Sequence, residues 1–151
     1  FGKKAQVCGV MAGPRIDEVK DNAFRLPSRL NSTWGGNFTD MVRSTHYLRI
    51  IEQERLVENA GKVGAYFLDQ LRDLQTEEPL ISAARGCGVF LAFDLPDAKT
   101  REEFWHGFFD LGVLTLRSGE NSIRFRPALD ITAEAIDEAM ELMRKFCRQR
   151  K

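Results

Sequence analysis

The pattern of apolar and polar positions in the second half of the chain predicts a small sheet covered by helices. Residues 88–95, "GVFLAFDL", are apolar at nearly every position, as expected for a strand that is buried on both faces. Residues 122–126 alternate apolar and polar side chains, which predicts a second strand, and residues 113–116 predict a third. Helical patterns near 101–111 and 132–148 are expected to cover this sheet.

The middle of the chain predicts helical structure. Apolar side chains recur with helical spacing from Asp40 onward, and Thr39 is the expected N-cap of this helix. A second helical pattern extends to about Leu74, and Pro79 ends the region. The glycines of "NAGKVG", residues 59–64, are an expected interruption. The pattern is therefore compatible with two helices or with one long kinked helix.

Local signals also mark the starts of the later helices. Thr100–Glu103, "TREE", has the form of a capping box, and Thr132 is the expected cap of the last helix. Strands and helices are thus mixed along the chain, which predicts an α/β fold with an α+β arrangement in its small domain.

The N-terminal part has a different pattern. Ala5 to Met11 is short and apolar and predicts a buried strand that ends in a turn. Residues 14–38 contain two prolines and a Gly pair and show no sustained period, which predicts a long irregular connection. Because this segment carries aromatic and aliphatic anchors, we expect it to be ordered, with another subunit as one candidate for the surface it contacts.

Composition excludes several functional classes. Acidic and basic residues balance at 22 each, so no net charge attracts nucleic acid, and no run of about 18 apolar residues predicts a membrane span. The cysteines, Cys8, Cys87 and Cys147, have neither disulfide-framework nor zinc-site spacing, which is typical of thiols in a reducing compartment such as the cytoplasm. His46 and His106 lie far apart, so no metal site is expected.

Three stretches carry candidate chemistry. The pair Lys3 and Lys4 offers amines, although most such pairs are surface residues. The loop "NSTWGGN", residues 31–37, could bind a phosphate through its hydroxyls or could be a locally capped turn. Arg124 and Arg126 project from one side of a strand. They could bind a carboxylate if that side faces a cleft, and they are ordinary strand arginines if it faces water. Together these groups suggest a lysine that holds pyridoxal phosphate (PLP) as a Schiff base for work on amino acids.

Four motifs, in order and in register, carry a family resemblance: "FGKK…CGVMAG", "RLNSTWGGN", "RGCGVFLAFDLPD" and "SIRFRPAL". They resemble the C-terminal part of the class III, fold-type-I, PLP-dependent aminotransferases. Within this class the chain is most similar to the L-lysine 6-aminotransferases, and the 4-aminobutyrate aminotransferases are more distant.

The resemblance implies roles for individual residues. Lys3 corresponds to the catalytic lysine that binds PLP covalently, and Lys4 is only its neighbour. Thr33 corresponds to the threonine that reaches the PLP phosphate of the neighbouring subunit in a homodimer, and Asn31 and Ser32 line the same loop. Arg124 corresponds to the arginine that holds the α-carboxylate of glutamate or 2-oxoglutarate.

The resemblance also implies a domain organisation and an activity. Residues 1–38 are expected to be a remnant of the large PLP-binding domain, residues 39–79 the connecting helices, and residues 80–151 the small C-terminal domain. The implied reaction transfers the terminal amino group of L-lysine to 2-oxoglutarate and gives glutamate. Two alternatives remain: 4-aminobutyrate or another ω-amino acid as the donor, or an inactive fragment with a structural or interaction role.

Overall fold

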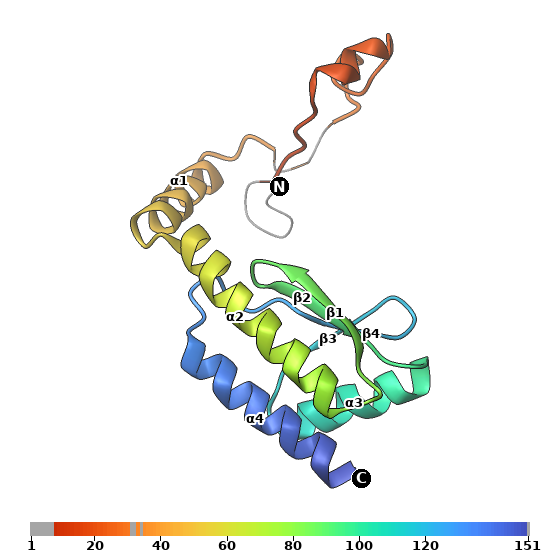
Figure 1. Ribbon diagram of the computed structural model, residues 1–151. Coiled ribbons are helices and arrows are strands. Elements are labelled where there is room, and N and C mark those ends of the chain that lie inside the picture. The colour runs from red at the N-terminus through yellow and green to blue at the C-terminus, as the bar shows by residue number, and fades with distance from the viewer. Residues whose placement is uncertain (1–7, 31–32, 34, 151) are drawn as a thin grey trace. The chain divides into compact units, whose positions relative to one another are not determined.

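The computed structural model describes residues 8–30, 33 and 35–150, and the chain divides into two compact units, Phe1–Glu54 and Arg55–Lys151 (Figure 1). The first unit contains a short 3-10 helix and one α-helix. The second contains the sheet and the remaining helices.

Asn22 organises the irregular segment of the first unit. The 3-10 helix η1 spans Pro14–Glu18, and the Asn22 side chain is buried beside it. Asn22 Nδ2 donates hydrogen bonds to the carbonyl oxygens of Ile16 (3.0 Å) and Val19 (2.9 Å), while Oδ1 accepts one from the Phe24 amide (3.0 Å). The segment is therefore irregular, as predicted. The Asn22 hydrogen bonds organise it, whereas the expected apolar anchors Phe24 and Leu30 are exposed.

The strand expected at Ala5 to Met11 is not present in its described part. Residues 8–13 form no strand, and Val10 and Met11 are exposed. Residues 5–7 lie outside the described residues. An apolar run becomes a strand only where a neighbouring strand satisfies its backbone groups, and the sequence pattern alone does not reveal that neighbour.

Helix α1 spans Phe38–Gln53, and its N-cap is Asn37 instead of the expected Thr39. Asn37 Oδ1 accepts hydrogen bonds from the amides of Thr39 (2.9 Å) and Asp40 (3.4 Å). Asparagine and threonine both favour the cap position, so residue type did not decide between them. The large apolar side chains of α1 are exposed: Phe38, Met41, Val42, Tyr47, Leu48 and Ile50.

Helix α2 spans Leu56–Glu77 and is separate from α1. The break lies at Glu54–Arg55, where Arg55 adopts a left-handed conformation with φ of 52°. The interruption expected at 59–64 is therefore wrong, because α2 continues through these residues. Gly64 is buried within them, where it meets the backbone of Gly88. Its lack of a side chain serves close packing and does not break the helix.

The sheet has four antiparallel strands in the order β1-β2-β4-β3: β1 (Ser82–Cys87), β2 (Phe90–Asp94), β3 (Leu116–Ser118) and β4 (Ser122–Phe125). The predicted strands at β2 and β4 are confirmed. The third predicted strand begins three residues later than expected. Strand β1 was missed, because this edge strand of small and polar residues lacks the apolar alternation that marks a strand.

Two further helices complete the second unit. Helix α3 spans Ala98–Asp110 and is capped by Asp97, whose Oδ1 accepts a hydrogen bond from the amide of Thr100 (2.8 Å). The capping role expected of Thr100 is therefore wrong. Helix α4 spans Ala133–Arg150, and Thr132 Oγ1 accepts a hydrogen bond from a backbone amide three residues on (3.3 Å), as predicted.

Helices α2, α3 and α4 cover one face of the sheet, and the other face is open. Helices α2 and α4 lie side by side (Figure 1). Leu91 and Phe93 of β2 are buried in the core beneath the helices, whereas Phe90 on the same strand is half exposed. The burial of this strand on both faces was therefore predicted wrongly. Among the described residues, no helix is long and apolar enough to cross a membrane.

Candidate functional site

Arg124 lies on the open face of the sheet, on the inner strand β4. Strand β4 lies between β2 and β3, so Arg124 has cross-strand partners on both sides, Ala92 of β2 and Leu116 of β3. Residues two positions apart on a strand share a face, so Phe90 is a diagonal neighbour of Arg124. The small Ala92 side chain leaves space above the strand for the longer arginine.

The Arg124 guanidinium has no counter-ion within the described chain. Its side chain makes neither a hydrogen bond nor an ion pair with another described residue, and its Nε is completely enclosed. The guanidinium carbon lies 5.5 Å from the ring centroid of Phe90. A guanidinium within about 6 Å of an aromatic ring centroid is attracted by the ring's negative face. Within the described residues, the group is therefore a positioned cation with an aromatic contact and no anionic partner.

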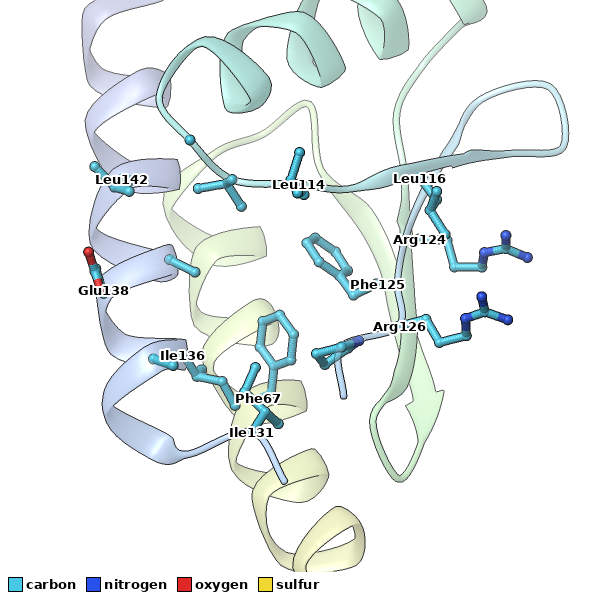
Figure 2. A pocket seen from close by; sticks show the side chains of 15 residues that line it. Phe67, Leu114, Leu116, Arg124, Phe125, Arg126, Ile131, Ile136, Glu138 and Leu142 are labelled. Carbon is cyan, nitrogen blue, oxygen red and sulfur yellow. The ribbon is translucent and has the colours of Figure 1, made fainter. Parts of the chain in front are cut away.

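Arg126 is the first residue after β4, and it is exposed. Figure 2 shows Arg124 and Arg126 on one side of the strand, pointing away from Phe125 and Phe67, which face the helices. The two arginines therefore share a side, as the alternation predicts. The sequence left open whether that side faces a cleft.

Two cavities border this strand. One of about 470 Å³ is lined mainly by apolar side chains such as Phe67 and Ile136 on the helix side, and both arginines contribute to its border. Their guanidinium groups point away from that helix side (Figure 2). The other cavity, of about 490 Å³, is bordered by Phe90 and Arg126. The ring that contacts Arg124 therefore lines a recess of the second unit.

A second arginine on the open face is already neutralised. Arg85 Nη2 lies 2.8 Å from Asp94 Oδ1, and the Ser122 hydroxyl donates a hydrogen bond of 2.5 Å to the same oxygen. The hydrogen bond from Arg85, followed by that from Ser122, lowers the pKa of Asp94 below its ordinary value, although burial opposes the shift. Sequence reasoning missed this cluster. It differs from Arg124, whose charge is paired with no carboxylate of the described residues.

The other predicted site residues belong to the first unit. Lys3, Asn31 and Ser32 lie outside the described residues. Thr33 lies in an exposed turn, and its hydroxyl makes no hydrogen bond with another described residue. The hydroxyl can therefore donate to a phosphate oxygen, so this residue fits the phosphate group of PLP. Within the described ranges, no three His, Cys, Asp or Glu side chains form a potential metal site.

The comparisons with known proteins identify the family. The model of the class-III aminotransferases matches residues 2–147, so the chain belongs to the class-III aminotransferase family. Enzymes of this class depend on PLP. The family resemblance and the predicted class, mixed helices with a small sheet from a fold-type-I aminotransferase, are confirmed.

Individual relatives are similar to this chain in sequence, and a solved structure is also similar in fold. The L-lysine-epsilon aminotransferases of Mycobacterium tuberculosis and Streptomyces clavuligerus are each 47% identical over 145 residues, which is 95% of this chain and 32% of theirs. The mitochondrial 4-aminobutyrate aminotransferase of Sus scrofa is 37% identical over 130 residues, 85% of this chain and 25% of its own. The solved lysine aminotransferase from M. tuberculosis in the internal aldimine form is 46% identical, with a TM-score of 0.83 over 96% of this chain and 34% of its own. The chain spans about a third of the length of the lysine relatives.

Proposed function

We propose that the complete protein carrying this chain is a PLP-dependent aminotransferase that transfers the terminal amino group of L-lysine to 2-oxoglutarate. The Arg124 guanidinium on the open sheet face, which forms no ion pair with any described residue, is the observation that carries this proposal. The 47% identity to lysine-epsilon aminotransferases supports lysine as the donor, against 37% to a 4-aminobutyrate and 35% to an ornithine aminotransferase.

Arg124 binds the α-carboxylate of 2-oxoglutarate and of the product glutamate. A guanidinium offers parallel N–H groups that match the two oxygens of a carboxylate, and such bidentate pairs are both strong and directional. Arg124 is suited to this role because no carboxylate of the described chain occupies it. Arg85 is unsuited, since Asp94 already binds it.

The first unit supplies the residues for the cofactor. Thr33 donates its hydroxyl to the cofactor phosphate of the neighbouring subunit in a homodimer, and Asn31 and Ser32 line the same loop. The exposed turn at Thr33 supports this assignment, because its hydroxyl remains available to a partner outside its own segment.

Lys3 holds the cofactor covalently at rest and later moves a proton at the reacting carbon as a general acid and base. When bound, PLP supplies an electron sink that stabilises negative charge on the carbon attached to the transferred nitrogen. Lys3 must be neutral to accept the proton, so its role depends on a local environment that disfavours the ammonium form.

The cytoplasm is the proposed site of action. Cys8 and Cys87 are exposed free thiols, and Cys147 is buried. Exposed thiols without a disulfide partner are typical of reducing compartments.

The test supplies the complete protein with PLP, 2-oxoglutarate and L-lysine labelled with ¹⁵N on either the α- or the ε-nitrogen. We expect labelled glutamate only from the ε-labelled lysine, and a higher kcat/KM for lysine than for L-ornithine or 4-aminobutyrate. Absence of glutamate would contradict the aminotransferase assignment. A preference for 4-aminobutyrate would keep the reaction class and replace the donor.

A further inference from the structure

We infer that Phe90 is a positioning residue for Arg124: its ring holds the guanidinium in the orientation that binds a carboxylate end-on. This inference rests on the proposed function, because it concerns how Arg124 recognises the dicarboxylate. It adds a residue from a different strand to the site.

The strand register explains why these two side chains meet. Arg124 lies opposite Ala92, and Leu91 lies opposite Phe125. Phe90 is therefore one pair further along, level with Arg126, and it projects from the same face as Ala92, diagonal to Arg124. Diagonal neighbours of this kind lie within reach of aromatic and long side chains. The 5.5 Å from the guanidinium carbon to the Phe90 centroid is consistent with this geometry.

Enclosure of Nε determines which edge of the guanidinium a ligand can reach. A carboxylate can bind an arginine side-on, through Nε and one terminal nitrogen, or end-on, through both terminal nitrogens. Nε of Arg124 is enclosed and has no hydrogen-bond partner among the described residues, so the side-on edge is closed to a ligand. The two terminal nitrogens remain for end-on binding. The Phe90 ring fixes the plane in which they lie.

Arg126 lacks this arrangement, although it shares the strand side. Among the described residues, the aromatic rings that lie under a guanidinium contact Arg117, Arg124 and Arg150, and none contacts Arg126. Arg126 is also more exposed than Arg124. The structure therefore distinguishes the two arginines by physical contacts, which their charge and spacing alone do not.

The experiment compares Phe90→Leu, Phe90→Tyr and Arg124→Ala in the complete protein. Phe109→Leu is the matched control, because Phe109 of α3 is 52% exposed and Phe90 is 51% exposed, while the Phe109 ring lies under no guanidinium of the described residues. Two quantities are measured for each variant: the dissociation constant of glutarate by calorimetry, and the rates of the lysine and 2-oxoglutarate half-reactions. Thermal unfolding confirms that each variant folds.

We expect Phe90→Leu to weaken glutarate binding and to slow the 2-oxoglutarate half-reaction by roughly 3- to 30-fold, the range of a cation–π contact as its desolvation increases. The lysine half-reaction should change by less than about 2-fold, well under the loss of a full cation–π contact. Phe90→Tyr keeps an aromatic face and should retain glutarate binding, and Phe109→Leu should behave as the unsubstituted protein.

The outcomes separate this inference from the proposed function. If Arg124→Ala weakens glutarate binding but Phe90→Leu does not, the positioning role of Phe90 is overturned and the carboxylate role of Arg124 stands. If Arg124→Ala also leaves glutarate binding unchanged, the carboxylate role itself is wrong. Equal losses in both half-reactions for Phe90→Leu would show a general structural role and would overturn the inference.

Discussion

Gly64 of α2 lies directly against the backbone of Gly88, the residue that follows β1. A Cβ atom built on Gly64 would lie 2.1 Å from the carbonyl oxygen of Gly88, closer than any van der Waals contact allows. Gly88 itself has φ of +54°, a left-handed conformation that favours glycine. This contact fixes the turn that leads into β2 and thereby sets the position of Phe90.

We expect Gly64→Ala to destabilise the protein by about 1–3 kcal/mol, because backbone atoms must move to admit the methyl group. The measurement is the free energy of unfolding of the full chain in urea. Gly61→Ala in the same helix is the control. No atom lies within 4 Å of a Cβ at Gly61, so alanine there should stabilise the helix by about 0.5–1 kcal/mol. Equal effects at the two positions would show that the close contact is absent.

The Arg85–Asp94 pair makes a pH-dependent contribution to stability. The pKa of Asp94 is lowered in the folded state, chiefly by the hydrogen bond from Arg85. The pair therefore stabilises the fold at pH values above 3.8, the ordinary pKa of this carboxyl group. This contribution is lost as the pH falls through the lowered folded-state pKa. Because the Arg85 side chain is half exposed, we expect the ion pair to contribute at most about 1 kcal/mol to the free energy of unfolding.

The check is urea unfolding of the full chain and of Asp94→Asn between pH 7 and pH 2.5. The difference in unfolding free energy between the two proteins should be constant near neutral pH and should decrease as the pH falls below about 3.8. Asp73→Asn serves as the comparison, since Asp73 is exposed and forms no ion pair with another described residue. A difference for Asp94→Asn that persists unchanged at pH 2.5 would rule out the ionic origin.

The choice between the two adjacent lysines also has a direct test. Reduction of the complete protein with borohydride fixes the cofactor to the lysine that holds it, and peptide mass spectrometry then locates the label. We expect the label on Lys3. We also expect Lys3→Ala to abolish turnover, while Lys4→Ala retains most of it. A label on Lys4 would shift the motif register by one residue.

Thr33 is expected to contribute one hydrogen bond to the cofactor phosphate. Thr33→Val preserves the shape of the side chain and removes the hydroxyl. The loss of one charge-assisted hydrogen bond should weaken PLP binding by about 1.5–3 kcal/mol, measured as the dissociation constant of PLP from the complete protein. The corresponding control is Thr45→Val, because the Thr45 hydroxyl donates to the Met41 carbonyl within α1. Unchanged affinity in Thr33→Val would remove Thr33 from the cofactor site.

Sequence patterns predicted the elements that have strong local signals. The alternation around Ile123 and Phe125 identified β4, and Thr132 correctly marked the start of α4. The caps of α1 and α3 were misplaced, because several residues with good capping propensity stand close together at each site. Which of them accepts the amide hydrogen bonds depends on backbone geometry that composition does not specify.

The candidate site was predictable only in part, for a similar reason. The alternation placed Arg124 and Arg126 on one side of a strand, and the family motif selected the first. The contact with Phe90 could not be predicted, because it depends on the register between β2 and β4. The Arg85–Asp94 pair could not be predicted either, because strand β1, which contains Arg85, carries no clear sequence signal.

The most direct test of the account is single-turnover kinetics of Arg124→Ala in the complete protein, with each half-reaction measured separately and Arg126→Ala as the control. We predict that Arg124→Ala slows the 2-oxoglutarate half-reaction by roughly 30- to 1000-fold in kcat/KM, the range expected for loss of a bidentate, partly desolvated arginine–carboxylate pair. The lysine half-reaction should be affected far less, and Arg126→Ala should have a small effect on both. Equal losses in the two half-reactions of Arg124→Ala would contradict the account and would make Arg124 a structural residue.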